Sequence, residues 1–146
     1  MLQKTFHREP LRQGMFQLTS GVLVIDTDPL DLDIYSDILR SLGHEVVACA
    51  SYPEALRQLI AKKFELVVMD QGGADFEGRV VLEQLSTLGM RVPTIVLGRQ
   101  KSMRCYLKAL ELGAVDYFEK PVSPDEIKRL VSALIPPRVI TGIFQD

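Results

Sequence analysis

The chain has 146 residues, a length that fits one domain with a hydrophobic core of its own. Apolar residues make up 47% and charged residues 25%, which is typical of a folded globular protein and argues against disorder. The 17 basic and 19 acidic side chains give a net charge of −2, so no broad surface for direct nucleic-acid binding is expected. No apolar run reaches the length of about 18 residues that indicates a membrane span.

The two ends of the chain differ from its middle. Residues 1–20 have apolar side chains at irregular spacing, which favours a mobile extension over a helix that docks on the domain or on a partner. Their basic residues are followed by no continuous apolar segment, so they do not match a secretory signal. Residues 136–146 begin with two prolines and continue as a β-prone tail. The domain is therefore predicted at 21–135.

The chain has two cysteines, and both fall inside predicted regular elements. Cys49 and Cys105 are far apart in the sequence, with no spacing that is typical of a metal site or a disulfide framework. We interpret them as reduced thiols in or near the core of a cytoplasmic protein.

Strands and helices alternate through the predicted domain. In chain order, the patterns predict a strand at 22–25, a helix at 29–42, a strand at 45–50, a helix at 51–60, a strand at 65–70, a helix at 80–88, a strand at 94–97, a helix at 103–112, a strand at 115–118 and a helix at 123–134. Such alternation is typical of a doubly wound parallel sheet with helices on both faces.

Details of the pattern predict where several helices begin and which faces they bury. Ser51 and Ser123 each precede a glutamate by three residues, which is typical of a capping box at the start of a helix. Helical spacing predicts inner faces of the first two helices at Leu30, Ile34, Tyr35, Ile38, Leu39 and Leu42, and at Ala55, Leu59 and Ile60.

Polar and small residues stand where the predicted strands end. Asp26 and Asp28 follow the first strand, Asp70 ends the third, Gly98 follows the fourth and Lys120 comes just after the fifth. The carboxyl ends of parallel strands form the ligand crevice of open α/β folds, so these residues should converge. At the tip of its strand, the carboxylate of Asp70 stays partly hydrated and reactive.

Clustered carboxylates need a balancing charge. Two like charges about 4 Å apart repel by about 4 kcal/mol at an effective dielectric constant near 20, so the cluster either raises a pKa or binds a hard cation such as Mg²⁺. A lysine can hold a phosphoryl oxygen, and an aspartate can attack phosphorus to form an aspartyl phosphate. Metal, lysine and nucleophile together favour phosphoryl transfer.

The sequence resembles the receiver domain of two-component response regulators. The resemblance covers Gly21 to Leu134 and rests on several motifs in the same order. These motifs are Val-Leu-Val-Ile-Asp at 22–26, Leu-Val-Val-Met-Asp at 66–70, Gly78, Val-Pro-Thr-Ile-Val-Leu at 92–97 and Leu-Glu-Leu-Gly-Ala-Val-Asp-Tyr-Phe-Glu-Lys-Pro at 110–121. It implies a flavodoxin-like, five-stranded parallel sheet of strand order 2-1-3-4-5 with five helices.

The resemblance also implies roles for single residues. Asp70 matches the phosphoacceptor, and Lys120 matches the lysine that pairs with the phosphoryl group. Asp26 matches the first member of the acidic pair that binds Mg²⁺ together with Asp70, and Gly72 matches the residue that offers a backbone carbonyl to the metal. Tyr117 matches the aromatic side chain that changes rotamer when the domain switches; its other interpretation is a core residue.

Two positions depart from the family pattern. Thr27 replaces the second acid of the pair, which predicts a weakened Mg²⁺ site. Asp28 either supplies a carboxylate to the metal through a water or caps the following helix, and the proline after it favours the cap. Gly98 replaces the switch hydroxyl that bonds the phosphoryl group. Losing a hydrogen bond of about 1.5–3 kcal/mol predicts a coupling weaker by about 10- to 150-fold.

The resemblance implies a signalling module rather than an enzyme. A histidine kinase or phosphotransfer protein would phosphorylate Asp70 with Mg²⁺, and output would pass to an unidentified downstream protein. The face made by 103–112, 115–118 and 124–134 would bind that partner or a second copy in a homodimer. The alternative is a phosphate-independent pseudo-receiver that acts as a protein-interaction module. A flavin enzyme on this fold is disfavoured, because Asp-Thr-Asp at 26–28 would repel a phosphate.

Overall fold

The computed structural model describes residues 21–99 and 102–137, so the predictions for the N-terminal extension and for most of the C-terminal tail fall outside the described residues. Its elements are β2 (Val22–Ile25), α2 (Pro29–Ser41), β3 (Val46–Cys49), α3 (Tyr52–Ala61), β4 (Leu66–Asp70), α4 (Arg79–Thr87), β5 (Thr94–Gly98), α5 (Met103–Glu111), β6 (Asp116–Glu119) and α6 (Pro124–Leu134). The predicted alternation is confirmed, with boundaries that differ by one or two residues at most elements.

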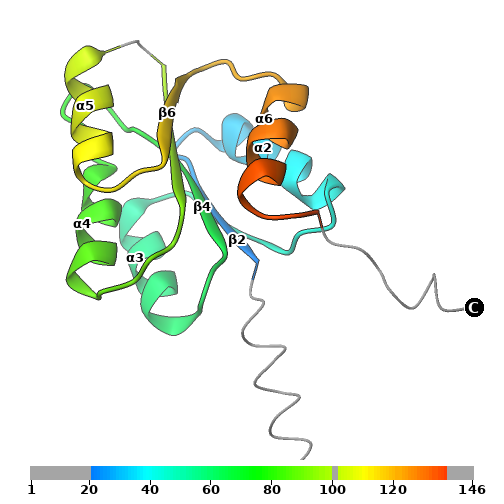
Figure 1. The fold of residues 1–146 in the computed structure, drawn as a ribbon, viewed down its shortest axis with the longest axis horizontal. Helices are drawn as coiled ribbons and strands as arrows, with labels where there is room; N and C mark the ends of the chain where they lie inside the picture. The colour runs from blue at the N-terminus through cyan, green and yellow to red at the C-terminus, as the bar shows by residue number, and fades with distance from the viewer. Residues whose placement is uncertain (1–20, 100–101, 138–146) are drawn as a thin grey trace, which may run out of the picture.

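The strands form one parallel sheet in the order β3-β2-β4-β5-β6. In Figure 1, α3, α4 and α5 lie on one side of the sheet, and α2 and α6 lie on the other. This is the predicted flavodoxin-like order, in which β2, the first strand of the described residues, lies between β3 and β4. The strand order reverses between β2 and β4, which places their carboxyl ends at the crevice of the fold.

The three central strands explain why the sheet has helices on both faces. All residues of β2, β4 and β5 are buried. Alternate side chains point to opposite faces, so Leu23 and Val67 pack with α3, α4 and α5, while Val24 and Val68 pack with α2 and α6. The two hydrophobic clusters hold the strand ends in fixed positions.

Serine side chains begin three of the helices. The hydroxyl oxygens of Ser51, Ser102 and Ser123 each accept a hydrogen bond from the backbone N–H three residues later. Each bond satisfies one of the N–H groups that the first turn of a helix leaves unpaired. The helix starts predicted at Ser51 and Ser123 are therefore confirmed.

The predicted inner faces of α2 and α3 are wrong at three positions. Leu30, Ile34 and Ile60 are 67%, 43% and 70% exposed. An α-helix has 3.6 residues per turn, so residues spaced by four drift around its axis, and only the middle of such a row can face the sheet. In α2 the buried apolar face centres on Tyr35, Ile38 and Leu39.

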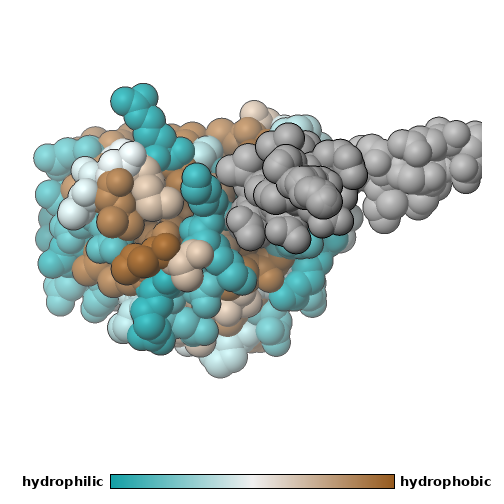
Figure 2. Space-filling view, turned by 90° about the horizontal axis from the view of Figure 1, so that it is seen from below, coloured by the Kyte–Doolittle hydropathy of each residue, from teal (hydrophilic) through white to brown (hydrophobic). Residues whose placement is uncertain are grey.

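Apolar side chains also reach the surface elsewhere. Figure 2 shows hydrophobic residues among hydrophilic ones on the face seen from below Figure 1. Some exposed apolar surface is ordinary for a folded domain. Within 21–99 and 102–137, no helix is long and apolar enough to cross a membrane.

We expect Cys49 to resist thiol reagents in the folded protein. Cys49 and Cys105 are buried free thiols, as predicted, and burial raises the pKa of Cys49 to about 11. Because the thiolate is the reactive form, little of it is present near neutral pH. In a Cys105→Ser variant, labelling of Cys49 by a chromogenic disulfide should be slow in buffer and fast in denaturant. Equally fast labelling in both conditions would contradict this expectation.

Candidate functional site

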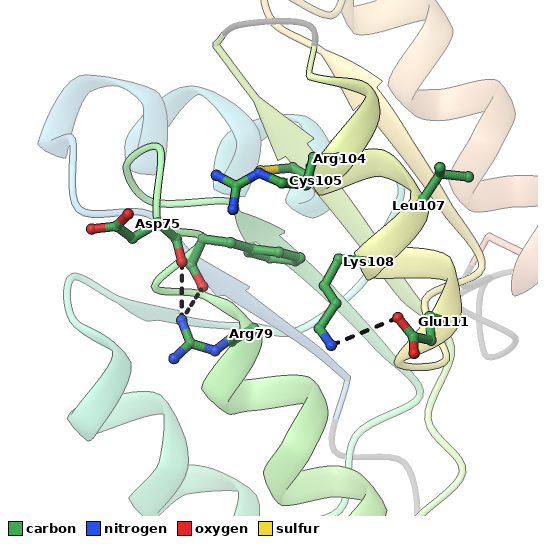
Figure 3. Close-up of a pocket in the computed structure, with 8 residues that line it drawn as sticks. Asp75, Arg79, Arg104, Cys105, Leu107, Lys108 and Glu111 are labelled. Carbon is green, nitrogen blue, oxygen red and sulfur yellow. Dashed lines mark hydrogen bonds and ion pairs between the residues drawn. The ribbon is translucent and has the colours of Figure 1, made fainter.

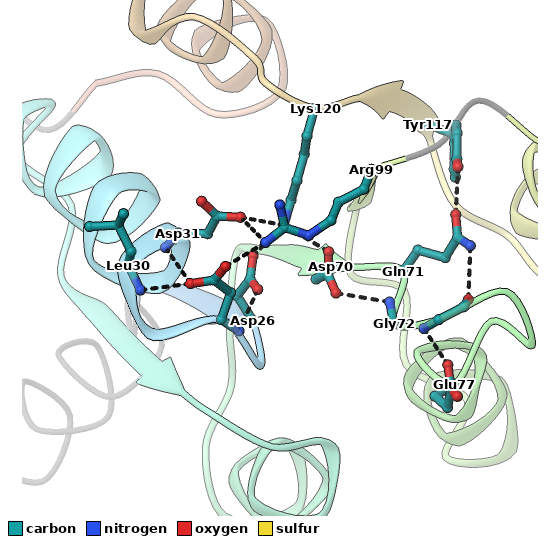
Figure 4. A network of polar contacts seen from close by, with 12 residues as sticks. Asp26, Leu30, Asp31, Asp70, Gln71, Gly72, Glu77, Arg99, Tyr117 and Lys120 are labelled. Carbon is teal, nitrogen blue, oxygen red and sulfur yellow. Dashed lines mark hydrogen bonds and ion pairs between the residues drawn. The ribbon is translucent and has the colours of Figure 1, made fainter.

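Three strand ends bring two carboxylates and an ammonium group together. The Nζ atom of Lys120 lies 2.7 Å from Oδ2 of Asp26 and 2.7 Å from Oδ1 of Asp70 (Figure 4). Asp26 follows β2, Asp70 ends β4 and Lys120 follows β6. The parallel sheet thus places at one edge three residues that are far apart in the sequence. All three are buried.

A third carboxylate, which the sequence analysis missed, completes the surroundings of the lysine. Asp31 lies in the first turn of α2, and its Oδ2 is 3.0 Å from Nζ of Lys120. Its sequence signal is its place three residues after Asp28, in the helix that starts directly at the crevice. A helix entered from a strand end directs its first turn toward that crevice, so Asp31 could have been considered.

Burial and charge act in opposite directions on the pKa of these groups. Burial lowers the pKa of Lys120, but the hydrogen bonds and charges of Asp26 and Asp70 outweigh it, so the pKa lies well above its usual range. Burial raises the pKa of Asp26, and its bond to Lys120 opposes that change. Lys120 is therefore a fixed cation at neutral pH.

Asp28 is the N-cap of α2. Its side chain accepts hydrogen bonds from the backbone N–H groups of Leu30, at 2.9 Å, and Asp31, at 3.4 Å. These bonds, first that from Leu30, together with Arg99 lower the pKa of Asp28. Of the two interpretations of Asp28, the structure shows the cap.

Arg99 was not predicted as a site residue. Its Nη2 atom lies 2.5 Å from Oδ2 of Asp28 and 2.9 Å from Oδ2 of Asp31. The guanidinium group therefore connects the residue that follows β5 to the start of α2. It adds a second cation to the acidic edge of the sheet.

The space beside Gly98 is filled by two other side chains. The hydroxyl of Tyr117 donates a hydrogen bond to Oε1 of Gln71, and both residues are buried. A Cβ atom added at Gly98 would lie 2.3 Å from the Tyr117 hydroxyl and 2.6 Å from Oε1 of Gln71. Residue 98 therefore lacks the switch hydroxyl, and Tyr117 and Gln71 occupy the space that any side chain at this position would need.

The donor set at the sheet edge fits Mg²⁺. Asp26 and Asp70 provide hard oxygen ligands, and Gly72 stands two residues after Asp70, to whose Oδ2 it donates a backbone hydrogen bond of 2.9 Å. Among the described residues, the four carboxylates of residues 26, 28, 31 and 70 pair with two cations, Arg99 and Lys120, so this set keeps a negative charge that a divalent ion can balance. Thr27 is exposed. Among the described residues, no three acidic, histidine or cysteine side chains form a metal-binding group by themselves.

A separate surface hollow lies between α4 and α5, with a volume of about 700 Å³ (Figure 3). Its polar side chains largely bond to the protein itself. Arg79 donates to the carbonyl oxygens of Asp75 and Phe76, Arg104 donates to that of Ala74, and Lys108 pairs with Glu111 at 3.6 Å. Asp70 is not among its lining residues.

Fold and site together define a class of protein: a doubly wound α/β domain with a buried acid–lysine cluster at the carboxyl edge of its sheet. The family profile described as the response regulator receiver domain matches residues 22–132. The chain belongs to this family.

Similar sequences and structures agree with this assignment. The chain is 31% identical to the transcriptional regulatory protein ZraR of Salmonella typhimurium over 107 residues, which are 73% of this chain and 24% of that protein. It is 33% identical to the two-component response regulator ARR11 of Arabidopsis thaliana over 119 residues, which are 80% of this chain and 23% of that protein. The chain therefore spans about a quarter of these relatives' length.

Solved receiver domains share the fold. A CheY-like receiver domain protein from Methanospirillum hungatei superposes with a TM-score of 0.71 at 28% identity, covering 77% of this chain and 90% of that one. The receiver domain of the Francisella response regulator 1452 gives a TM-score of 0.70 at 26% identity, covering 77% and 93%.

Proposed function

We propose that this receiver domain accepts a phosphoryl group on Asp70 from a histidine kinase or a phosphotransfer protein. The observation that carries the proposal is the ion pair between Nζ of Lys120 and Oδ1 of Asp70, at 2.7 Å. It places a permanent cation beside the carboxylate that would become phosphorylated. Membership of the receiver family supports the same role.

The transfer is a displacement at phosphorus. An oxygen of Asp70 forms the new bond to phosphorus while the bond from phosphorus to the donor histidine nitrogen breaks, and the electron pair stays on that nitrogen. Lys120 balances the charge of the phosphoryl oxygens. Mg²⁺, held by Asp26, Asp70 and the carbonyl of Gly72, would supply further charge neutralisation. The domain thus serves as an acceptor in signalling and not as an enzyme with its own turnover.

Output would pass to another protein, in the cytoplasm. We place the contact on the face formed by α5, β6 and α6, where Met103, Leu107 and Val115 are exposed around α5 and just before β6. A homodimer through this face is part of the proposal. The printed names of the relatives, a transcriptional regulatory protein and a two-component response regulator, support a role in signal transduction.

The second candidate function is a pseudo-receiver that binds partners without phosphate. It is favoured by the site around Gly98, where Tyr117 and Gln71 already fill the space of the missing switch side chain. Thr27 in place of an acid favours it too. In that case Asp70 and Lys120 would be a structural ion pair.

Acetyl phosphate separates the two candidates. We expect the protein incubated with acetyl phosphate and Mg²⁺ to gain the mass of one phosphoryl group, measured by intact-mass spectrometry. Asp70→Asn should abolish the gain, because the amide is not a nucleophile, and removing Mg²⁺ with a chelator should strongly reduce it. Asp33→Asn, an exposed change on α2, is the matched control and should behave like the parent. No gain in the parent protein would favour the pseudo-receiver.

A further inference from the structure

Arg99 is the first side chain beyond β5 that reaches the acidic edge of the sheet. Gly98 has no side chain, and the space beside it is filled by Tyr117 and Gln71. If a side chain at the end of β5 binds a phosphoryl group on Asp70, it must therefore belong to a residue other than Gly98. Arg99 follows immediately and carries a charge opposite to that of a phosphoryl group.

The guanidinium group of Arg99 already lies among the site residues. Its Nη2 is 2.9 Å from Oδ2 of Asp31, and the same oxygen is 3.0 Å from Nζ of Lys120. Lys120 in turn contacts Asp70 at 2.7 Å. Arg99 and Lys120 are thus neighbours that share one carboxylate oxygen, and Figure 4 shows both side chains converging on the acidic cluster.

The ion pairs that Arg99 now makes are weak enough for the guanidinium group to exchange them for another ligand. The side chain of Arg99 is 59% exposed, and those of its partners Asp28 and Asp31 are 39% and 20% exposed. Exposed ion pairs contribute little to stability, since water screens them. Asp28 also has a second role as N-cap, which it keeps if the arginine leaves.

A phosphoryl group is the better ligand for a guanidinium. Phosphorylation converts the single charge of Asp70 into about two negative charges with three acceptor oxygens. The planar fork of arginine binds such a group through paired hydrogen bonds, which a lysine cannot match.

We propose that Arg99 is a phosphoryl ligand: when Asp70 carries the phosphoryl group, the guanidinium leaves Asp28 and Asp31 and binds the phosphoryl oxygens. This inference rests on the proposed function of Asp70. Arg99 would then make the contact with the phosphoryl group that the hydroxyl replaced by Gly98 cannot make. It also breaks the connection between the end of β5 and the start of α2.

Beryllofluoride, a non-covalent mimic of the phosphoryl group, tests the exchange. Its binding to the full chain with Mg²⁺ is measured by fluorine NMR titration. We expect Arg99→Ala to weaken binding by about tenfold, since a charge-assisted hydrogen bond is lost. Arg99→Lys should be intermediate, because it keeps the charge and loses the fork. The matched control is Arg91→Ala, which removes the same charge from an exposed residue before β5 and should bind like the parent.

Asp28→Asn should change the affinity for beryllofluoride in the opposite direction from Arg99→Ala. Asparagine still caps α2 but competes less for Arg99, so binding of beryllofluoride should tighten by up to about fivefold. If the ion pair between Arg99 and Asp28 only stabilised the fold, Arg99→Ala and Asp28→Asn would not change the affinity for beryllofluoride in opposite directions. Weaker binding by Asp28→Asn would overturn the exchange.

The outcomes separate this inference from the function on which it rests. If the parent gains a phosphoryl group from acetyl phosphate and Arg99→Ala binds beryllofluoride as tightly as Arg91→Ala, the role of Arg99 is wrong and that of Asp70 stands. If the parent neither gains mass nor binds beryllofluoride, both proposals are overturned.

Discussion

Replacing Lys120 by methionine should lower the free energy of unfolding by about 3–5 kcal/mol at neutral pH. Its ammonium group is the common partner of Asp26, Asp31 and Asp70, and the lysine side chain is only 4% exposed. Without it, three carboxylates would face one another in a buried site. Urea unfolding followed by circular dichroism measures the loss, and added Mg²⁺ should stabilise the variant more than the parent.

A surface lysine gives the matched control. Lys108→Met removes an exposed partner of Glu111 and should change stability by less than about 1 kcal/mol. The contribution of Lys120 to the free energy of unfolding should also depend on pH. Because its pKa in the folded protein lies above its unfolded value, the stabilisation is complete below about pH 10.4 and is lost as the pH rises through the folded-state pKa. Equal losses for the two lysines would contradict the central role of Lys120.

Adding one methyl group at Gly98 should destabilise the protein by about 1–3 kcal/mol. Alanine is ordinarily favoured over glycine in a strand, so intrinsic propensity alone predicts the opposite sign. The new Cβ would lie 2.3 Å from the Tyr117 hydroxyl and 2.6 Å from Oε1 of Gln71, well inside contact distance. Chemical unfolding of Gly98→Ala measures the cost.

A double-mutant cycle assigns that cost to the tyrosine. Tyr117→Phe removes the hydroxyl that a side chain at residue 98 would meet, so the two changes together should cost less than their sum, by about 0.5 kcal/mol or more. Gly73→Ala is the control, since its Cβ would meet only the flexible side chain of Glu77, at 3.3 Å. Additive effects at residues 98 and 117 would show that the packing seen here does not limit residue 98.

The sequence was sufficient to predict the backbone plan of this domain. Buried apolar runs mark β2, β4 and β5 because strands covered on both faces need apolar side chains throughout. Once the strands are parallel, residues that follow them share one edge. The meeting of Asp26, Asp70 and Lys120 follows from that rule alone.

The residues missed are those whose position depends on side-chain reach or helix rotation. Asp31 reaches Lys120 because of how the first turn of α2 is rotated, and the same rotation leaves Leu30 and Ile34 exposed. Arg99 is a long side chain whose partners come from a distant segment. Periodicity gives neither property, since it describes one element at a time. The roles of Asp70 as phosphoacceptor, of Lys120 as phosphoryl-binding residue and of Tyr117 as switch residue stay predictions.

The edge strands of the sheet, β3 and β6, affect how this domain can associate with another chain. Each is only four residues long, and β6 begins and ends with an acidic residue, Asp116 and Glu119. Short, charged margins of a sheet discourage backbone pairing with another chain. In the homodimer that we propose, the contacts are therefore expected to come from side chains of the α5, β6 and α6 face, and the sheet is protected from growing into a continuous intermolecular one.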